Sequence, residues 1–163
     1  AMGAKVIALC SSQEKLLAAK EQGADELLLS NDPDLKDKIK ALTENKGVDV
    51  VYEVVGGDLF NVCARSMAWN GRLLVVGFAS GSIPEFPVNL ALVKGCSVIG
   101  VFWGSFAQKE PANFIVNMQE LLAWYAQGQV KVVIDQVYPL SQAPEALTKV
   151  FNRQSIGKLI LTP

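Results

Sequence analysis

Apolar segments of strand length alternate with helix-forming segments along most of the chain, and this alternation is the feature that most constrains the fold. The strands are expected at residues 4–10, 24–29, 48–55, 72–78 and 97–102. Residues 48–55 are nearly all aliphatic, as is typical of a strand buried on both faces of a parallel sheet. The alternation predicts an α/β fold with a doubly wound parallel sheet, because right-handed crossovers place helices on both of its faces.

Capping and turn residues mark the expected helix boundaries. Ser11 and Glu14 have the spacing of a capping box, and Asp32 followed by a proline predicts the start of a second helix. A third helix is expected over residues 57–68, and Asn70-Gly71 then starts the next strand. These signals divide the chain into consecutive strand–helix units.

A long helix is expected from Pro111, with an apolar stripe that predicts one buried face. The residues of that face are Phe114, Met118, Leu121, Leu122 and Tyr125. After Gly128, which follows the helix, the pattern changes to a strand, a helix and a final strand within residues 129–163. This last segment is interpreted as a return toward a neighbouring domain.

The composition excludes several classes of function. The formal net charge of −1 argues against nucleic-acid binding through a basic surface, and no apolar run has the length of a membrane span. The chain has no histidine, so a Ser-His-Asp triad, a Cys-His dyad and a histidine-based metal site are excluded within it. Its 3 scattered cysteines are expected to be free thiols in a reducing compartment. We therefore expect a cytoplasmic protein, with mitochondria as the alternative, that binds neither nucleic acid nor membranes.

The loop after the first expected strand favours a phosphate ligand. In a doubly wound sheet, ligands bind at the carboxyl ends of the strands, and an NAD-selective domain usually has an acid after its second strand to bind the ribose. This chain has Cys10, Ser11 and Ser12 there, followed by Lys15. Hydroxyls and an ammonium suit a phosphate dianion better than a diol. The alternative is that Ser11 only caps its helix and that Lys15 is solvated.

Three further loops end strands at the same expected edge. Gly56 and Gly57 would allow a cofactor to approach the backbone, although a tight turn alone also favours glycine. Residues 77–81 end their strand mostly with small residues, as a wall against a flat ligand would require, and Phe102-Trp103 ends the last strand with aromatic rings. Phe102 and Trp103 would line the ligand in this interpretation, and the alternative is that they only pack in the core.

Four segments together are specific enough to indicate a family. They read AMGAKVIA at residues 1–8, GVDVVYEVVG at 47–56, GRLLVVGFASG at 71–81 and GKLIL at 157–161. With them the chain resembles the zinc-free quinone-oxidoreductase branch of the medium-chain dehydrogenase/reductase superfamily. The resemblance implies a Rossmann-type domain in a homo-oligomeric enzyme that passes hydride from NADPH to a quinone or an α,β-unsaturated carbonyl.

The resemblance also implies which residues bind the cofactor. Ser12 and Lys15 would hold the adenosine 2′-phosphate, and Arg153 would be the C-terminal basic contact, with a solvated helix end as its alternative. Gly56 would lie close to the cofactor backbone. The nicotinamide would be lined by the loop and strand end that comprise Phe78, Ala79, Ser80, Gly81, Phe102 and Trp103. Catalytic residues are not assigned, and no metal is expected.

Two departures from the family pattern change the expectations. Ser30 stands where many members have a tyrosine near the 2′-phosphate, which weakens the case for strict NADPH preference. The glycine-rich loop and first strand of the family are not found, so residues 1–128 are expected to be a truncated dinucleotide-binding domain. Residues 129–163 would complete the substrate domain of a longer parent protein. In the strand order 3-2-1-4-5-6, residues 4–10 and 48–55 would then lack the strand between them.

Such a fragment is expected to be inactive alone and to need a companion strand or to self-associate. A non-catalytic nucleotide-binding protein, or a crystallin-like structural or interaction module, is the alternative function. The residues discussed above do not indicate which substrate the parent protein uses.

Overall fold

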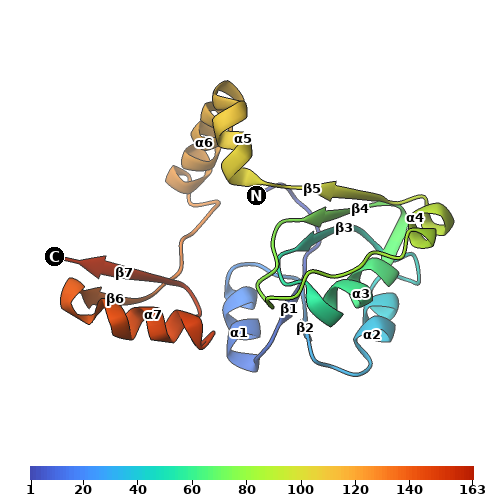
Figure 1. Cartoon of the computed structure of the whole chain (residues 1–163), viewed down its shortest axis with the longest axis horizontal. Helices are drawn as coiled ribbons and strands as arrows, with labels where there is room; N and C mark the ends of the chain where they lie inside the picture. The colour runs from blue at the N-terminus through green and yellow to red at the C-terminus, as the bar shows by residue number, and fades with distance from the viewer. The chain divides into compact units, whose positions relative to one another are not determined.

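The computed structural model describes residues 1–163, which divide into two compact units. One unit consists of Ala1–Leu27 together with Ile115–Pro163, and the other of Leu28–Phe114. Both contain parallel β-strands and α-helices in alternation (Figure 1). The expected α/β class is therefore confirmed.

The unit formed by Leu28–Phe114 is built around a parallel sheet in the order β3-β4-β5. These strands are β3 (Val48–Glu53), β4 (Met67–Val75) and β5 (Ser97–Gly100). Its helices are α2 (Leu35–Leu42), α3 (Gly57–Arg65), α4 (Asn89–Lys94) and α5 (Trp103–Lys109). The central strand carries Leu73, which is 0% exposed, and Phe60 of α3 and Leu35 of α2 are also buried. The core thus lies between β4 and the helices that cover it.

The other unit contains two pairs of strands. β1 (Ile7–Cys10) and β2 (Glu26–Leu29) form one two-stranded sheet, and α1 (Gln13–Glu21) contacts β1. β6 (Ile134–Pro139) and β7 (Lys158–Thr162) form a parallel pair, with η1 (Leu140–Gln142) and α7 (Ala143–Phe151) between them in sequence. The buried hydrophobic side chains among these elements and their connections are Leu16, Ala24, Tyr138 and Ala146.

The structure corrects one expectation, about the burial of β3. β1 and β3 belong to different sheets and do not pair with each other. The expectation that β3 is buried on both faces is wrong, since Tyr52 is 68% exposed and Val50 is exposed as well. β3 is an edge strand here that pairs with β4 alone. The aliphatic sequence of β3 therefore shows that its side chains can be buried, but it does not show which element packs against them.

The third helix ends earlier than expected, at Arg65, and Met67 already pairs with Val48 in the sheet. The Ser66 hydroxyl donates to the Val62 carbonyl, which closes the last turn of the helix. Asn70 has a φ of 60° and lies inside β4, where the register shifts between Val48 and Val50. The Asn-Gly pair is thus a bulge within the strand and not its start.

Two helix starts also differ from the capping signals. Ser12, not Ser11, is the N-cap of α1, and α2 begins at Leu35 after the N-cap Asp34. Asp32 still organises that start, because its carboxylate accepts the Asp34 N–H at 2.8 Å.

The long helix is present as α6 (Pro111–Ala126), but its expected apolar face has no buried residue. Leu121, Leu122 and Tyr125 are exposed. An apolar stripe identifies the face that a helix can bury, whereas burial also requires a second element against that face. No helix of the structure is both long enough and apolar enough to cross a membrane.

Candidate functional site

Two turns meet at the carboxyl edge of the β3-β4-β5 sheet, and we call them together the turn cluster. The first turn, residues 54–57, follows β3, and the second, residues 78–82, follows β4. The Ala79 N–H donates to the Val54 carbonyl at 3.0 Å, and the Ser80 N–H donates to the Val55 carbonyl at 2.8 Å. The structure therefore brings Gly56 together with the loop that contains Phe78, Ala79, Ser80 and Gly81. Their role toward a cofactor stays a prediction.

The first turn requires glycine at position 56. Gly56 has a φ of 73° and a ψ of −156°, a region that is essentially restricted to glycine. A Cβ added there would lie 2.6 Å from the Ser82 carbonyl oxygen and 3.3 Å from the Phe78 ring. The second turn thus packs directly on the position where a side chain would start. The glycine is explained by the close approach of the two turns to each other.

Glu53, at the end of β3, is the residue of this edge that sequence reasoning missed. Its side chain is buried, with 3% of the residue exposed. Oε1 accepts the N–H groups of Val55 and Gly56, both at 2.9 Å, and Oε2 lies 3.1 Å from the Gly56 nitrogen. The available signal was an acid inside an aliphatic strand, separated by two valines from a Gly-Gly pair. Such an acid requires partners when it is buried.

The charge of Glu53 also affects a neighbouring thiol. Burial, and in second place the negative charge of Glu53, raise the pKa of Cys63 to about 12. The reactive species of cysteine is the thiolate, and at about pH 8 roughly one Cys63 in ten thousand would be ionised. Cys63 is therefore an unreactive thiol of the core.

We predict that iodoacetamide labels Cys63 on the order of a hundredfold more slowly than Cys10, which is half-buried. Peptide mass spectrometry of the native protein at about pH 8 measures both rates. Labelling in denaturant is the control, because unfolding should make the two rates similar. Equal rates in the native protein would contradict the burial of Cys63 beside Glu53.

The aromatic residues after β5 are not in the core. Phe102 is 78% exposed and Trp103 is 45% exposed. The Trp103 ring lies 5.4 Å from that of Phe106 and 5.5 Å from that of Phe114, centroid to centroid. The Val101 N–H donates to the Val75 carbonyl at 2.9 Å, so this strand end lies beside that of β4. The core-packing alternative is therefore wrong for Phe102, while Trp103 packs against an aromatic pair.

A basic cluster forms after β1 in the other unit. Ser12 is the N-cap of α1, and its hydroxyl accepts the Lys15 N–H at 3.4 Å. The Lys15 ammonium donates to the carbonyl oxygen of Arg153 at 2.6 Å. The structure thus brings together Ser12, Lys15 and the backbone of Arg153, which lie far apart in sequence. Lys15 is not simply solvated, as the alternative reading had it.

A cavity of about 310 Å³ adjoins this cluster. Its lining includes Cys10, Lys15, Gln22 and Ser155. Burial raises the pKa of Cys10, and the nearby Lys15 charge partly opposes this effect. Apolar side chains of Ala18, Ala19, Val133 and Ile156 complete the lining, so the cavity is largely apolar with the Lys15 cation in its wall.

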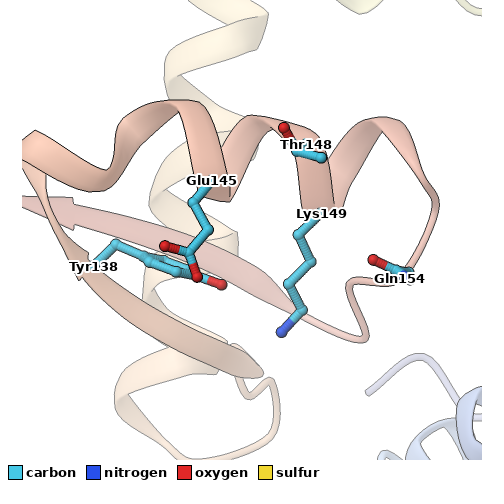
Figure 2. A pocket seen from close by; sticks show the side chains of 5 residues that line it. All are labelled: Tyr138, Glu145, Thr148, Lys149 and Gln154. Atoms are coloured by element: carbon cyan, nitrogen blue, oxygen red, sulfur yellow. The ribbon is translucent and has the colours of Figure 1, made fainter.

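A second cavity, of about 410 Å³, lies beside α7 (Figure 2). Glu145 and Lys149 point from α7 toward the strand that carries Tyr138. Lys149 forms an ion pair with Asp135 at 3.1 Å, and the Tyr138 hydroxyl donates to Gln136 at 2.9 Å. Lys149 also donates to Gln136 at 3.2 Å, so we interpret the contacts of Lys149, Asp135, Gln136 and Tyr138 as the packing of α7 on β6.

No group of three or more His, Cys, Asp or Glu side chains along residues 1–163 is arranged to hold a metal ion.

Comparison with known proteins gives relatives along nearly the whole chain. The family described as zinc-binding dehydrogenase matches residues 1–121. A quinone oxidoreductase-like protein 2 homolog of Nematostella vectensis is 38% identical over 160 residues, which cover 98% of this chain and 44% of that protein. The chain thus spans about half the length of the curated relatives that it matches.

Two solved structures also match nearly the whole chain. A quinone oxidoreductase of Pseudomonas syringae has 32% sequence identity and a TM-score of 0.87, over 99% of this chain and 50% of that one. A mycobacterial protein complexed with NADPH has 27% identity and a TM-score of 0.87, over 99% of this chain and 51% of that one.

Proposed function

Since the chain belongs to the zinc-binding dehydrogenase family, within the medium-chain dehydrogenase/reductase superfamily, we propose that it forms the cofactor half of an NADPH-dependent reductase. The substrates proposed are quinones and related α,β-unsaturated carbonyls. Relatives named quinone oxidoreductase support this substrate class.

The observation that carries the choice of NADPH is the basic cluster after β1. Ser12 and Lys15 stand where an NAD-selective domain usually has an acid, and Lys15 is held at the Arg153 carbonyl. An ammonium has three N–H groups, and Lys15 uses one of them in this contact. The others, with the Ser12 hydroxyl proton, fit a 2′-phosphate. The Arg153 side chain is exposed, and in this proposal it adds a second cation to the cluster.

We propose separately that the turn cluster binds a nicotinamide ring. Bound NADPH supplies a hydride, and a proton from the medium completes the two-electron reduction of the substrate. In this proposal Gly56 and the loop of residues 78–81 form the wall behind the nicotinamide, and exposed Trp103 offers an aromatic face beside it. We assign no catalytic residue within residues 1–163.

The test is the consumption of NADPH by the full-length gene product in the presence of 1,4-benzoquinone, measured by loss of nicotinamide absorbance. We expect NADPH to be consumed faster than NADH. Binding of NADPH without consumption would favour the non-catalytic alternative. A protein that binds neither nucleotide would contradict the proposal.

We also predict that turnover requires no metal ion, although the family carries the description zinc-binding. The chain has no histidine, and the nucleotide-binding residues proposed here are hydroxyls, amides and cations. Activity should survive exhaustive dialysis against a chelator. Activity lost on chelation and restored by added zinc would show that this prediction is wrong.

A further inference from the structure

Glu53 is buried at the end of β3, where its hydrogen bonds join it to the turn cluster. Its carboxylate accepts the N–H groups of Val55 and Gly56 within 2.9 to 3.1 Å. Its backbone carbonyl accepts the Val76 N–H at 2.8 Å, which continues the pairing of β3 with β4. One residue therefore joins the end of the sheet to the turn that follows it.

The geometry of the turn depends on these contacts. Gly56 has a φ of 73°, and the first turn is joined to the second by the Gly57 N–H, which donates to the Ser82 carbonyl at 3.3 Å. The amides of residues 55, 56 and 57 thus all have partners within the protein. The amides that begin a helix often bind a phosphate. Here the carboxylate of Glu53 is the anion beside the start of α3.

We propose that Glu53 is a positioning residue for cofactor binding. It holds the 55–56 turn against residues 78–82, so that the pair forms a fixed surface for the uncharged nicotinamide–ribose end of the cofactor. By engaging the turn amides itself, it also excludes a phosphate from this turn. This proposal rests on the proposed function. It adds Glu53 as a residue that affects cofactor binding through the turn, without contacting the cofactor itself.

The experiment uses Glu53→Ala, Glu53→Gln and the control Asp49→Ala in the full-length protein. Gln is isosteric and keeps one acceptor oxygen, whereas Asp49 is an exposed acid on the same strand. Two probes are titrated separately: NADPH, and adenosine 2′,5′-bisphosphate, which lacks the nicotinamide half. We expect Glu53→Ala to weaken NADPH about tenfold and Glu53→Gln to give an intermediate loss. Binding of the bisphosphate and all values for Asp49→Ala should stay unchanged.

Hydrogen exchange of the Val55 and Gly56 amides supplies a readout that needs no ligand. Exchange should be faster in Glu53→Ala than in the wild type, and unchanged in Asp49→Ala. Wild-type exchange in Glu53→Ala, or equal loss of both probes, would overturn the proposal. If the wild-type protein binds neither probe, the proposed function fails and the cofactor role of Glu53 fails with it. The amide exchange then still decides whether the carboxylate holds the turn.

Discussion

Replacement of Lys15 by alanine in the full-length protein is expected to weaken NADPH binding by ten- to a hundredfold and to leave NADH binding nearly unchanged. Only NADPH carries the 2′-phosphate, and a charge-assisted hydrogen bond contributes about 1.5–3 kcal/mol, which corresponds to this range. The effect should be large because the Arg153 carbonyl already holds the Lys15 ammonium in place at 2.6 Å. Titration of both nucleotides by fluorescence measures the two dissociation constants.

Lys20→Ala is the matched control for this prediction. Lys20 lies near the other end of α1, where its ammonium is 3.4 Å from the Asp25 carbonyl oxygen. Its loss removes the same charge from the same helix without changing the basic cluster. Equal losses of NADPH and NADH affinity in Lys15→Ala would show that Lys15 does not bind the 2′-phosphate.

Substitution of Gly56 by alanine should be the most disruptive single change at the turn cluster. The backbone conformation costs a residue with a Cβ about 1–3 kcal/mol, and the Cβ would also lie 2.6 Å from the Ser82 carbonyl oxygen. The second turn must therefore move away from the first. We expect a loss of at least about 2 kcal/mol in the free energy of unfolding, measured by urea denaturation, together with weaker NADPH binding.

Gly81→Ala separates the clash from the backbone strain. Gly81 also has a positive φ, 83°, but a Cβ there would meet nothing within 4 Å. Its replacement should cost only the conformational term, about 1–2 kcal/mol. If Gly56→Ala is no more destabilising than Gly81→Ala, the close approach of the two turns is not required for stability.

The sequence predicted which segments form strands better than it predicted where the strands and helices begin and end. A buried strand is a short aliphatic run, and Leu73 lies in such a run at the centre of its sheet. The Asn70-Gly71 pair predicted a strand start because its residues favour a positive φ. Instead, Met67 pairs with Val48, so β4 begins before Asn70. The Asn70-Gly71 pair then forms a bulge inside the strand.

Burial was harder to predict than structure type. The apolar face of α6 and the side chain of Tyr52 were both expected to be buried, yet they are exposed. Hydrophobic pattern shows which surface is apolar, and it carries no information about the segment that covers it. This is why the aliphatic character of β3 suggested burial on two faces when the strand lies at an edge.

The sequence indicated several candidate residues of the site but not the contacts that join them. Glycine and small residues after β3 and β4 indicated a ligand edge, and Lys15 indicated a phosphate. Neither pattern showed that Lys15 meets the backbone of Arg153, since that contact joins positions 138 residues apart. Glu53 was missed because an acid in a strand is usually read as a solvent-facing residue, and only the structure shows its amide partners.

Transfer of deuterium from NADPH labelled at the nicotinamide C4 position tests the central claim most directly. The full-length protein is incubated with the labelled nucleotide and an α,β-unsaturated ketone, and the product is analysed by mass spectrometry. We predict one deuterium at the β-carbon of the saturated ketone, with much less product when labelled NADH replaces NADPH. Binding of NADPH without any deuterium in a product, or no binding of either nucleotide, would contradict the account.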